Sequence, residues 1–169
     1  DAKWASDIIA SNYGEIRVDH FSDYLLAGSQ GDEGAYETLF KGHQYPDIAR
    51  ATALNHYSNR VLSDEKLKDL LLFLKDSSAL VRNEAINSFT NSGSKDFSSD
   101  IEPLLRDSIR LVRLSAARYY ITTKTMSLDA IPFASSQKEY LESLEVIADF
   151  AGGQHQIALY HQAKGNVDL

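Results

Sequence analysis

The sequence predicts an all-α protein made of stacked antiparallel helix pairs, and three observations carry this prediction. The 169 residues include only 9 Gly and 3 Pro, too few turn-forming residues for a many-stranded sandwich or barrel. Leu and Ala together outnumber Val, Ile and Thr, which favours helix over strand. A segment with helical periodicity also recurs along the chain. Because one pair of short helices cannot bury both of its apolar faces alone, the pairs are expected to stack into an α-solenoid.

The recurring segment is the second helix of each pair. Three copies align without gaps on Arg50, Arg82 and Arg113, which lie 32 and 31 residues apart. Each copy carries apolar residues at spacing i, i+4 and i+8, with alanine in the middle and an aromatic ring last, and such residues share one helix face. We expect the alanine to allow close approach of a neighbouring helix. The three sets are Ala49, Ala53 and Tyr57; Val81, Ala85 and Phe89; and Val112, Ala116 and Tyr120.

A shorter helical pattern precedes each of these segments. In the middle unit it covers residues 67–74, with leucines at i, i+3, i+4 and i+7, and Ser63 is the expected N-cap. Leu72 and Phe73 extend the apolar surface beyond one stripe, so we expect this helix to be covered on more than one side. In the first unit the corresponding pattern covers residues 35–40.

Two serine–glutamate pairs have the spacing of a capping box, in which the two side chains accept backbone N–H groups at the start of a helix. Ser99 and Glu102 predict the start of the first helix of the third unit. Ser136 and Glu139 predict the start of a later helix, beyond the repeats.

These patterns divide the chain into three parts. Residues 1–32 are expected to form a helical pair that caps the N-terminal end of the stack, and residues 33–123 to form the repeats. Residues 124–169 contain the C-terminal helices, one of which is expected to end at the glycine pair 152–153. Residues 156–166 are similar to the first helix and turn of a tetratricopeptide repeat, so the last part leads into a partial repeat of that kind. The repeats are predicted at about residues 33–61, 62–92 and 93–123.

The second and third repeats resemble the HEAT-repeat family, particularly its short-period HEAT-like members, which place an Asp at the turn between the two helices and an Arg early in the second helix. In the first repeat Arg50 conforms, whereas Gln44 stands at the Asp position. The resemblance covers about residues 33–123 and implies a right-handed α-α superhelix, a HEAT-like α-solenoid. The matching pairs, each six residues apart, are Asp76 and Arg82, and Asp107 and Arg113.

A wider resemblance concerns the order of the segments. A short helix with Trp4, HEAT-like repeats with the string Arg-Ala-Thr-Ala-Leu at residues 50–54, and a tetratricopeptide-like segment are similar to the region that follows the haem domain in a family of bacterial exported multihaem cytochromes c. This resemblance implies an accessory region of a larger periplasmic or otherwise exported protein. The chain has no cysteine and hence no C-x-x-C-H motif, so we expect no cofactor in these residues. Because it begins with Asp1, we also expect a piece of a longer chain.

The charge balance and the hydropathy pattern disfavour two classes of partner. Lys and Arg number 17 against 24 Asp and Glu, a net charge of −7, and a field of this sign repels nucleic-acid phosphates and anionic membrane surfaces. The sequence also lacks an apolar run of about 18 residues, the length that a membrane-spanning helix needs. We therefore expect neither a nucleic acid nor a membrane as partner.

No residue pattern indicates catalysis or metal binding. The five histidines include no pair at i, i+3 or i+4, the spacing that would bring two metal ligands to one helix face. A glycine-rich phosphate loop and a G-x-S-x-G nucleophile motif are also absent. The Asp and Arg residues of the repeats are expected to be structural. Each Asp is expected to accept backbone N–H groups at the start of the second helix, while each Arg reaches the Asp of its own or of the adjacent unit.

These expectations make a non-enzymatic scaffold the main functional hypothesis. The stacked second helices would line a concave surface that binds a protein partner or a neighbouring domain of the same polypeptide, through scattered exposed side chains that carry no motif. The alternative is a HEAT-like DNA-binding or DNA-repair protein, for which Arg110, Arg113 and Arg118 form a local basic cluster. A lyase or hydroxylase on the same scaffold is a third class, but a metal-using hydroxylase needs His–Glu pairs that this sequence lacks.

Overall fold

The structure, a computed structural model, describes residues 20–59, 62–125 and 131–163, together with Trp4, Asp7, Ile8, Ser11 and Asn12. Within these residues every regular element is a helix, so the all-α prediction is confirmed. The 3₁₀ helices are η1 (Leu71–Lys75) and η2 (Glu102–Arg106). The α-helices are α2 (Phe21–Ser29), α3 (Glu33–Lys41), α4 (Asp47–Ser58), α5 (Asp64–Leu70), α6 (Ala79–Ser92), α7 (Ser98–Ile101), α8 (Arg110–Thr123), α9 (Ile131–Glu145) and α10 (Ala151–Ala163).

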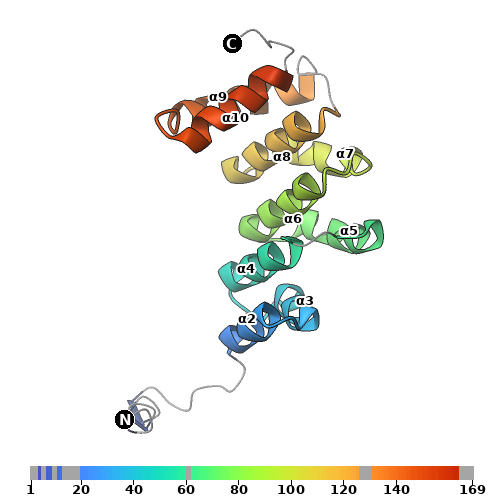
Figure 1. The fold of residues 1–169 in the computed structure, drawn as a ribbon. Coiled ribbons are helices and arrows are strands. Elements are labelled where there is room, and N and C mark those ends of the chain that lie inside the picture. Colours follow the sequence, from blue (N-terminus) through green and yellow to red (C-terminus); the bar gives the residue numbers. More distant parts are fainter. Residues whose placement is uncertain are drawn as a thin grey trace.

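The helices follow one another in two layers (Figure 1). In the first layer α4 contacts α6 and α6 contacts α8, and α2 extends this layer through its contacts with α3 and α4. The second layer contains α3, α5 with η1, and α7 with η2. Its members pack against the helix that follows them, α3 against α4, η1 against α6 and η2 against α8. At the C-terminal end α9 and α10 pack against each other and against α8.

The core between the two layers contains the residues that the periodicity predicts. Every member of the three i, i+4, i+8 sets is buried, and the central alanines Ala53, Ala85 and Ala116 have no exposed surface. Aromatic rings link the layers, since Phe40 of α3 lies edge-on to Tyr57 of α4 and to Phe73 of η1, each at a centroid distance of 5.2 Å. The buried face of the recurring segment is therefore confirmed.

The first helix of the middle unit differs from the prediction at its end. It begins as predicted, because the Ser63 hydroxyl accepts the N–H of Lys66 at 3.4 Å. At residue 71, however, the α-helix changes to the 3₁₀ helix η1. With about 3 residues per turn, Leu70 and Phe73 share one buried face, while Leu72 points to solvent with 62% of its surface exposed. The expectation that Leu72 is covered is wrong.

Both predicted capping boxes are wrong. The helix with Ser99 as its expected N-cap begins at Ser98, its N-cap is Phe97, two residues before the expected one, and no side chain caps it. α9 starts at Ile131, so Ser136 lies inside the helix, where its hydroxyl donates to the carbonyl oxygen of Leu105 at 2.5 Å. Glu139 is likewise inside α9 and binds an arginine of α8. In α9, the two side chains that the local pattern predicted to cap the helix instead bind residues of the preceding unit.

The connection between α9 and α10 also differs from the prediction. Gly152 and Gly153 were expected to end α9, but α9 ends at Glu145 and the two glycines lie in the first turn of α10. A Cβ atom at Gly153 would lie 1.9 Å from the carbonyl oxygen of Ile147. Glycine at this position therefore allows the start of α10 to approach the connecting segment closely.

The flanking predictions fall partly on residues that the structure does not describe. α2 supplies one helix of the pair predicted over residues 1–32, whereas the other helix lies mostly outside the described residues. In the tetratricopeptide-like segment α10 covers the predicted helix, and residues 164–166 of the predicted turn lie outside the description. Among the described helices, none has both the length and the hydropathy needed to cross a bilayer.

Candidate functional site

The arginines that align the repeats all reach into the following unit. Arg50 binds Asp76 with both nitrogens of its fork, Nη1 to Oδ1 at 3.2 Å and Nη2 to Oδ2 at 2.5 Å. Arg82 binds Asp107 in the same two-pronged way, through Nε at 2.9 Å and Nη2 at 3.0 Å. Of the two partners that the sequence left open, each arginine side chain therefore pairs with the carboxylate of the adjacent unit.

The third arginine, Arg113, has a partner that sequence reasoning missed. Its Nε and Nη2 each donate to a carboxylate oxygen of Glu139 in α9 at 2.8 Å. The partner residues in the three pairs are separated by 26, 25 and 26 residues. This constant separation was the signal that could have identified Glu139, although it stands within a helix and not at a turn.

The same aspartates also hold the starts of two second helices, α6 and α8. Asp76 accepts the N–H of Ser78 and Asp107 accepts the N–H of Ile109, both at 2.8 Å. Each arginine also donates to a backbone carbonyl oxygen of its own unit: Arg50 to Phe40, Arg82 to Asp76 and Arg113 to Asp107. We call Arg50–Asp76, Arg82–Asp107 and Arg113–Glu139 the inter-unit ion pairs.

The pKa values of the two aspartates show which interactions prevail in these pairs. Burial raises the pKa of Asp76, but the hydrogen bonds from Arg50 and from the Ser78 N–H outweigh it, so the pKa lies below its ordinary value. Burial likewise raises the pKa of Asp107, and Arg82 together with the Ile109 N–H lowers it further than burial raises it. Both carboxylates are therefore stabilised in their charged form, as in a structural ion pair, whereas an efficient proton-transfer group has a pKa near the working pH.

A second group of polar side chains, some buried and some exposed, connects α4, α6 and α8. Its centre is Glu84 of α6, whose carboxylate accepts hydrogen bonds from the amides of Asn55 at 2.9 Å, Asn83 at 2.7 Å and Asn87 at 3.4 Å. The amide of Asn59 donates to Asn55, and the Ser115 hydroxyl donates to Asn83. These residues connect all three helices, and we call them the Glu84 network.

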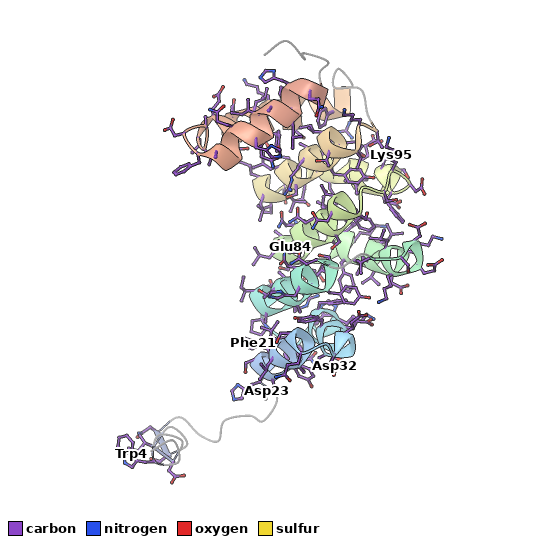
Figure 2. All side chains as sticks on the ribbon, in the orientation of Figure 1. Trp4, Phe21, Asp23, Asp32, Glu84 and Lys95 are labelled. Carbon is purple, nitrogen blue, oxygen red and sulfur yellow. The ribbon has the colours of Figure 1, made fainter. Side chains whose placement is uncertain are left out.

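A cavity of about 180 Å³ opens beside this network, between α4 and α6. In Figure 2 Glu84 lies on the side of the helix layer that faces away from α5. Exposed apolar side chains form part of the wall, since 62% of Ile48 and 38% of Leu80 is accessible to solvent. We call this cavity the Glu84 pocket; its lining residues are Ile48, Ala51, Thr52, Asn55, Leu80 and Glu84.

The charge of Glu84 is not balanced by a neighbouring cation. Among the ion pairs of the described residues none includes Glu84, and the three donors that hold its carboxylate are neutral amides. The basic residues of α4 and α6 other than histidine are Arg50 and Arg82, and both belong to the inter-unit ion pairs. Glu84 is thus a half-buried negative charge held in place by hydrogen bonds.

A larger cavity of about 530 Å³ lies between α2 and α3. Two carboxylates, Asp23 and Asp32, are among its lining residues, but Asp32 already accepts the N–H of Ala35 as the N-cap of α3. The residues that precede α2 in the chain, 13–19, lie outside the described part of the structure. We therefore regard the Glu84 pocket as the better-defined site.

The described residues contain no group of three or more His, Cys, Asp or Glu side chains arranged to hold a metal ion. No protein-family model matches the chain, and neither a curated protein nor a solved structure matches it.

Proposed function

We propose that this chain is a HEAT-like α-solenoid that serves as a non-catalytic scaffold for contacts with a protein partner or a neighbouring domain of the same polypeptide. The observation that carries the proposal is the repeated exposed face of α4, α6 and α8. Ile48, Leu80 and Leu111 each stand two residues before the repeat arginine, and all three are large apolar side chains with 38% or more of their surface exposed. Exposed apolar residues at equivalent positions of successive helices favour an extended binding surface.

The solenoid part of the proposal is supported by the inter-unit ion pairs. Each of them links one helix pair to the next, at a nearly constant separation along the chain. In an array of repeats each unit contacts mainly its neighbours, so regular links of this kind are expected.

The non-catalytic part is supported by the state of the polar side chains. The aspartates and arginines of the repeats are engaged in the inter-unit ion pairs, so these charged side chains are held in structural contacts. The DNA-binding alternative is weakened because Arg113, one of the three arginines of the basic cluster, is engaged by Glu139. The net charge of −7 also opposes it.

The accessory role in a periplasmic or otherwise exported multihaem cytochrome-like protein stays a prediction, supported by the order of the sequence segments alone. Sequencing of the gene upstream of Asp1 tests it. C-x-x-C-H motifs in the parent chain would support the parentage, and a parent chain without them would contradict it.

The scaffold proposal is tested by site-specific photo-crosslinking in the parent protein, expressed in its native host. A benzophenone side chain at position 80 or 111 is expected to give a discrete adduct, with a partner protein or within the parent chain, that mass spectrometry identifies. Position 72 is the matched control, because Leu72 is an apolar residue of the other layer with 62% exposure. Equal adducts at all three positions, or none at 80 and 111, would contradict the proposal.

A further inference from the structure

We infer that the Glu84 pocket is a receptor for a lysine or arginine side chain of a polypeptide segment that docks across α4 and α6. This inference rests on the proposed scaffold function and adds the chemistry of the partner. Three features of the pocket support the inference: the cavity itself, the Glu84 carboxylate that is held in place without a paired cation, and the apolar walls that can contact the stem of a long basic side chain.

The carboxylate is preorganised for a cation. Asn55, Asn83 and Asn87 hold it from two helices, so binding does not have to restrict the rotamers of a free glutamate side chain. The donors are neutral amides, which orient the carboxylate without cancelling its charge. Glu84 is partly buried, and in the described residues no cation pairs with it, so its charge is available to a basic side chain from outside.

The walls of the pocket match the stem of a basic residue. Lysine and arginine carry an aliphatic chain that packs against apolar surface while the charged end reaches a polar group. Ile48 and Leu80 provide apolar surface on the two helices that flank the cavity, and Glu84 provides the polar group. A neutral apolar residue would use the walls but leave the carboxylate unpaired, and an acidic residue would be repelled.

The repeat alignment restricts this preference to one place on the face. Glu84 stands two residues after Arg82, and the equivalent residues are Thr52 in α4 and Ser115 in α8. The residue equivalent to Asn87 in α8 is Arg118, a positive charge. The segment should therefore place its basic residue over α4 and α6 and carry no second basic residue over α8.

The test uses a library of random linear peptides, displayed and selected on the immobilised 169-residue chain. Selected peptides are resynthesised with the basic residue and with norleucine at the same position, and their dissociation constants are measured by fluorescence anisotropy. We expect the basic peptide to bind about tenfold more tightly, since a hydrogen bond to a charged group contributes about 1.5 kcal/mol or more. Glu84→Gln should abolish this difference, whereas Glu142→Gln, the same charge change on an exposed residue of α9, should leave it unchanged.

The possible failures separate the two proposals. In one outcome, peptides bind and Leu80→Ser weakens their binding, but the peptides lack basic residues, or the basic peptide still binds more tightly than the norleucine peptide in Glu84→Gln. The scaffold face then stands and the role of Glu84 is overturned. If no peptide is selected, or if Leu80→Ser has no effect on any selected peptide, both the peptide-binding face and the Glu84 receptor are overturned. Circular dichroism of each variant confirms that the protein compared is folded.

Discussion

The first and the third inter-unit ion pair are both two-pronged, but they lie in different surroundings. In both, an arginine donates through two nitrogens to the two oxygens of a carboxylate. Arg50 and Asp76 expose only 2% and 3% of their side-chain surface, whereas Arg113 and Glu139 expose 23% and 31%. The middle pair, Arg82 and Asp107, lies between them at 12% and 9%.

This difference in burial implies that the three ion pairs contribute differently to the stability of the protein. A buried ion pair adds little over a well-packed apolar pair, but removal of one partner leaves an uncompensated charge in the interior. An exposed pair is screened by water, so loss of one partner costs little. Loss of one partner should therefore destabilise the protein strongly at the first pair and only slightly at the third.

The largest effect is expected from Asp76→Ala. It leaves Arg50 buried with only the largely exposed Asp47, 3.7 Å away, as a counter-charge, and it removes the acceptor of the Ser78 N–H. The free energy of unfolding should therefore fall by about 3–5 kcal/mol. Urea denaturation measures the change. The double variant Arg50→Met/Asp76→Leu should recover much of the loss, and a loss below about 1 kcal/mol in the single variant would show that the pair is not held as the structure describes.

A smaller loss is expected from Asp107→Ala, because Arg82 retains some contact with water and with backbone carbonyls. The variant loses a helix cap and an ion pair, which together amount to about 1–3 kcal/mol. A lower melting temperature in thermal unfolding is the readout. An unchanged melting temperature would show that Asp107 has no structural role.

Acid titrates the middle pair without removing a side chain. Because the pKa of Asp107 is lowered in the folded protein, its contribution to stability is complete above the unfolded-state pKa of about 3.9 and is lost as the pH falls through the folded-state pKa. The difference in melting temperature between the wild type and Asp107→Asn should therefore be constant near neutral pH and shrink below about pH 4. A difference that widens in acid would show that folding raises the pKa of Asp107 and does not lower it.

The smallest effect is expected from Glu139→Gln. The pair is partly exposed, so the free energy of unfolding should fall by less than about 1 kcal/mol, and the loss should diminish further in about 1 M salt. Comparison of urea midpoints at low and high salt measures both. A loss of unfolding free energy as large as that of Asp76→Ala would mean that burial does not determine how much each pair contributes to stability.

Sequence periodicity was sufficient to predict the helices and their buried faces. The sets at i, i+4 and i+8 that contain Ala53, Ala85 and Ala116 mark the residues with which each helix contacts its neighbours. Periodicity was not sufficient for the ends of the helices. Ser136 has the spacing of a cap, but a carbonyl of the preceding unit takes its hydroxyl, and such a contact between distant residues leaves no local pattern.

The candidate site was hidden from sequence reasoning for the same reason. Asn55 and Glu84 are 29 residues apart and meet only when α4 lies beside α6. A single glutamate among asparagines has no motif that distinguishes it from a solvated surface residue. The cavity beside it exists only between two packed helices.

The inter-unit ion pairs have a further consequence for the order in which the chain folds. Each closes a loop of no more than 26 residues, and the elements in contact are close together along the chain. Short loops lose little entropy on closure, and proteins with such local contacts fold quickly. During synthesis the early units need nothing from the late ones, so α3 and α4 can be in place while α9 is still on the ribosome.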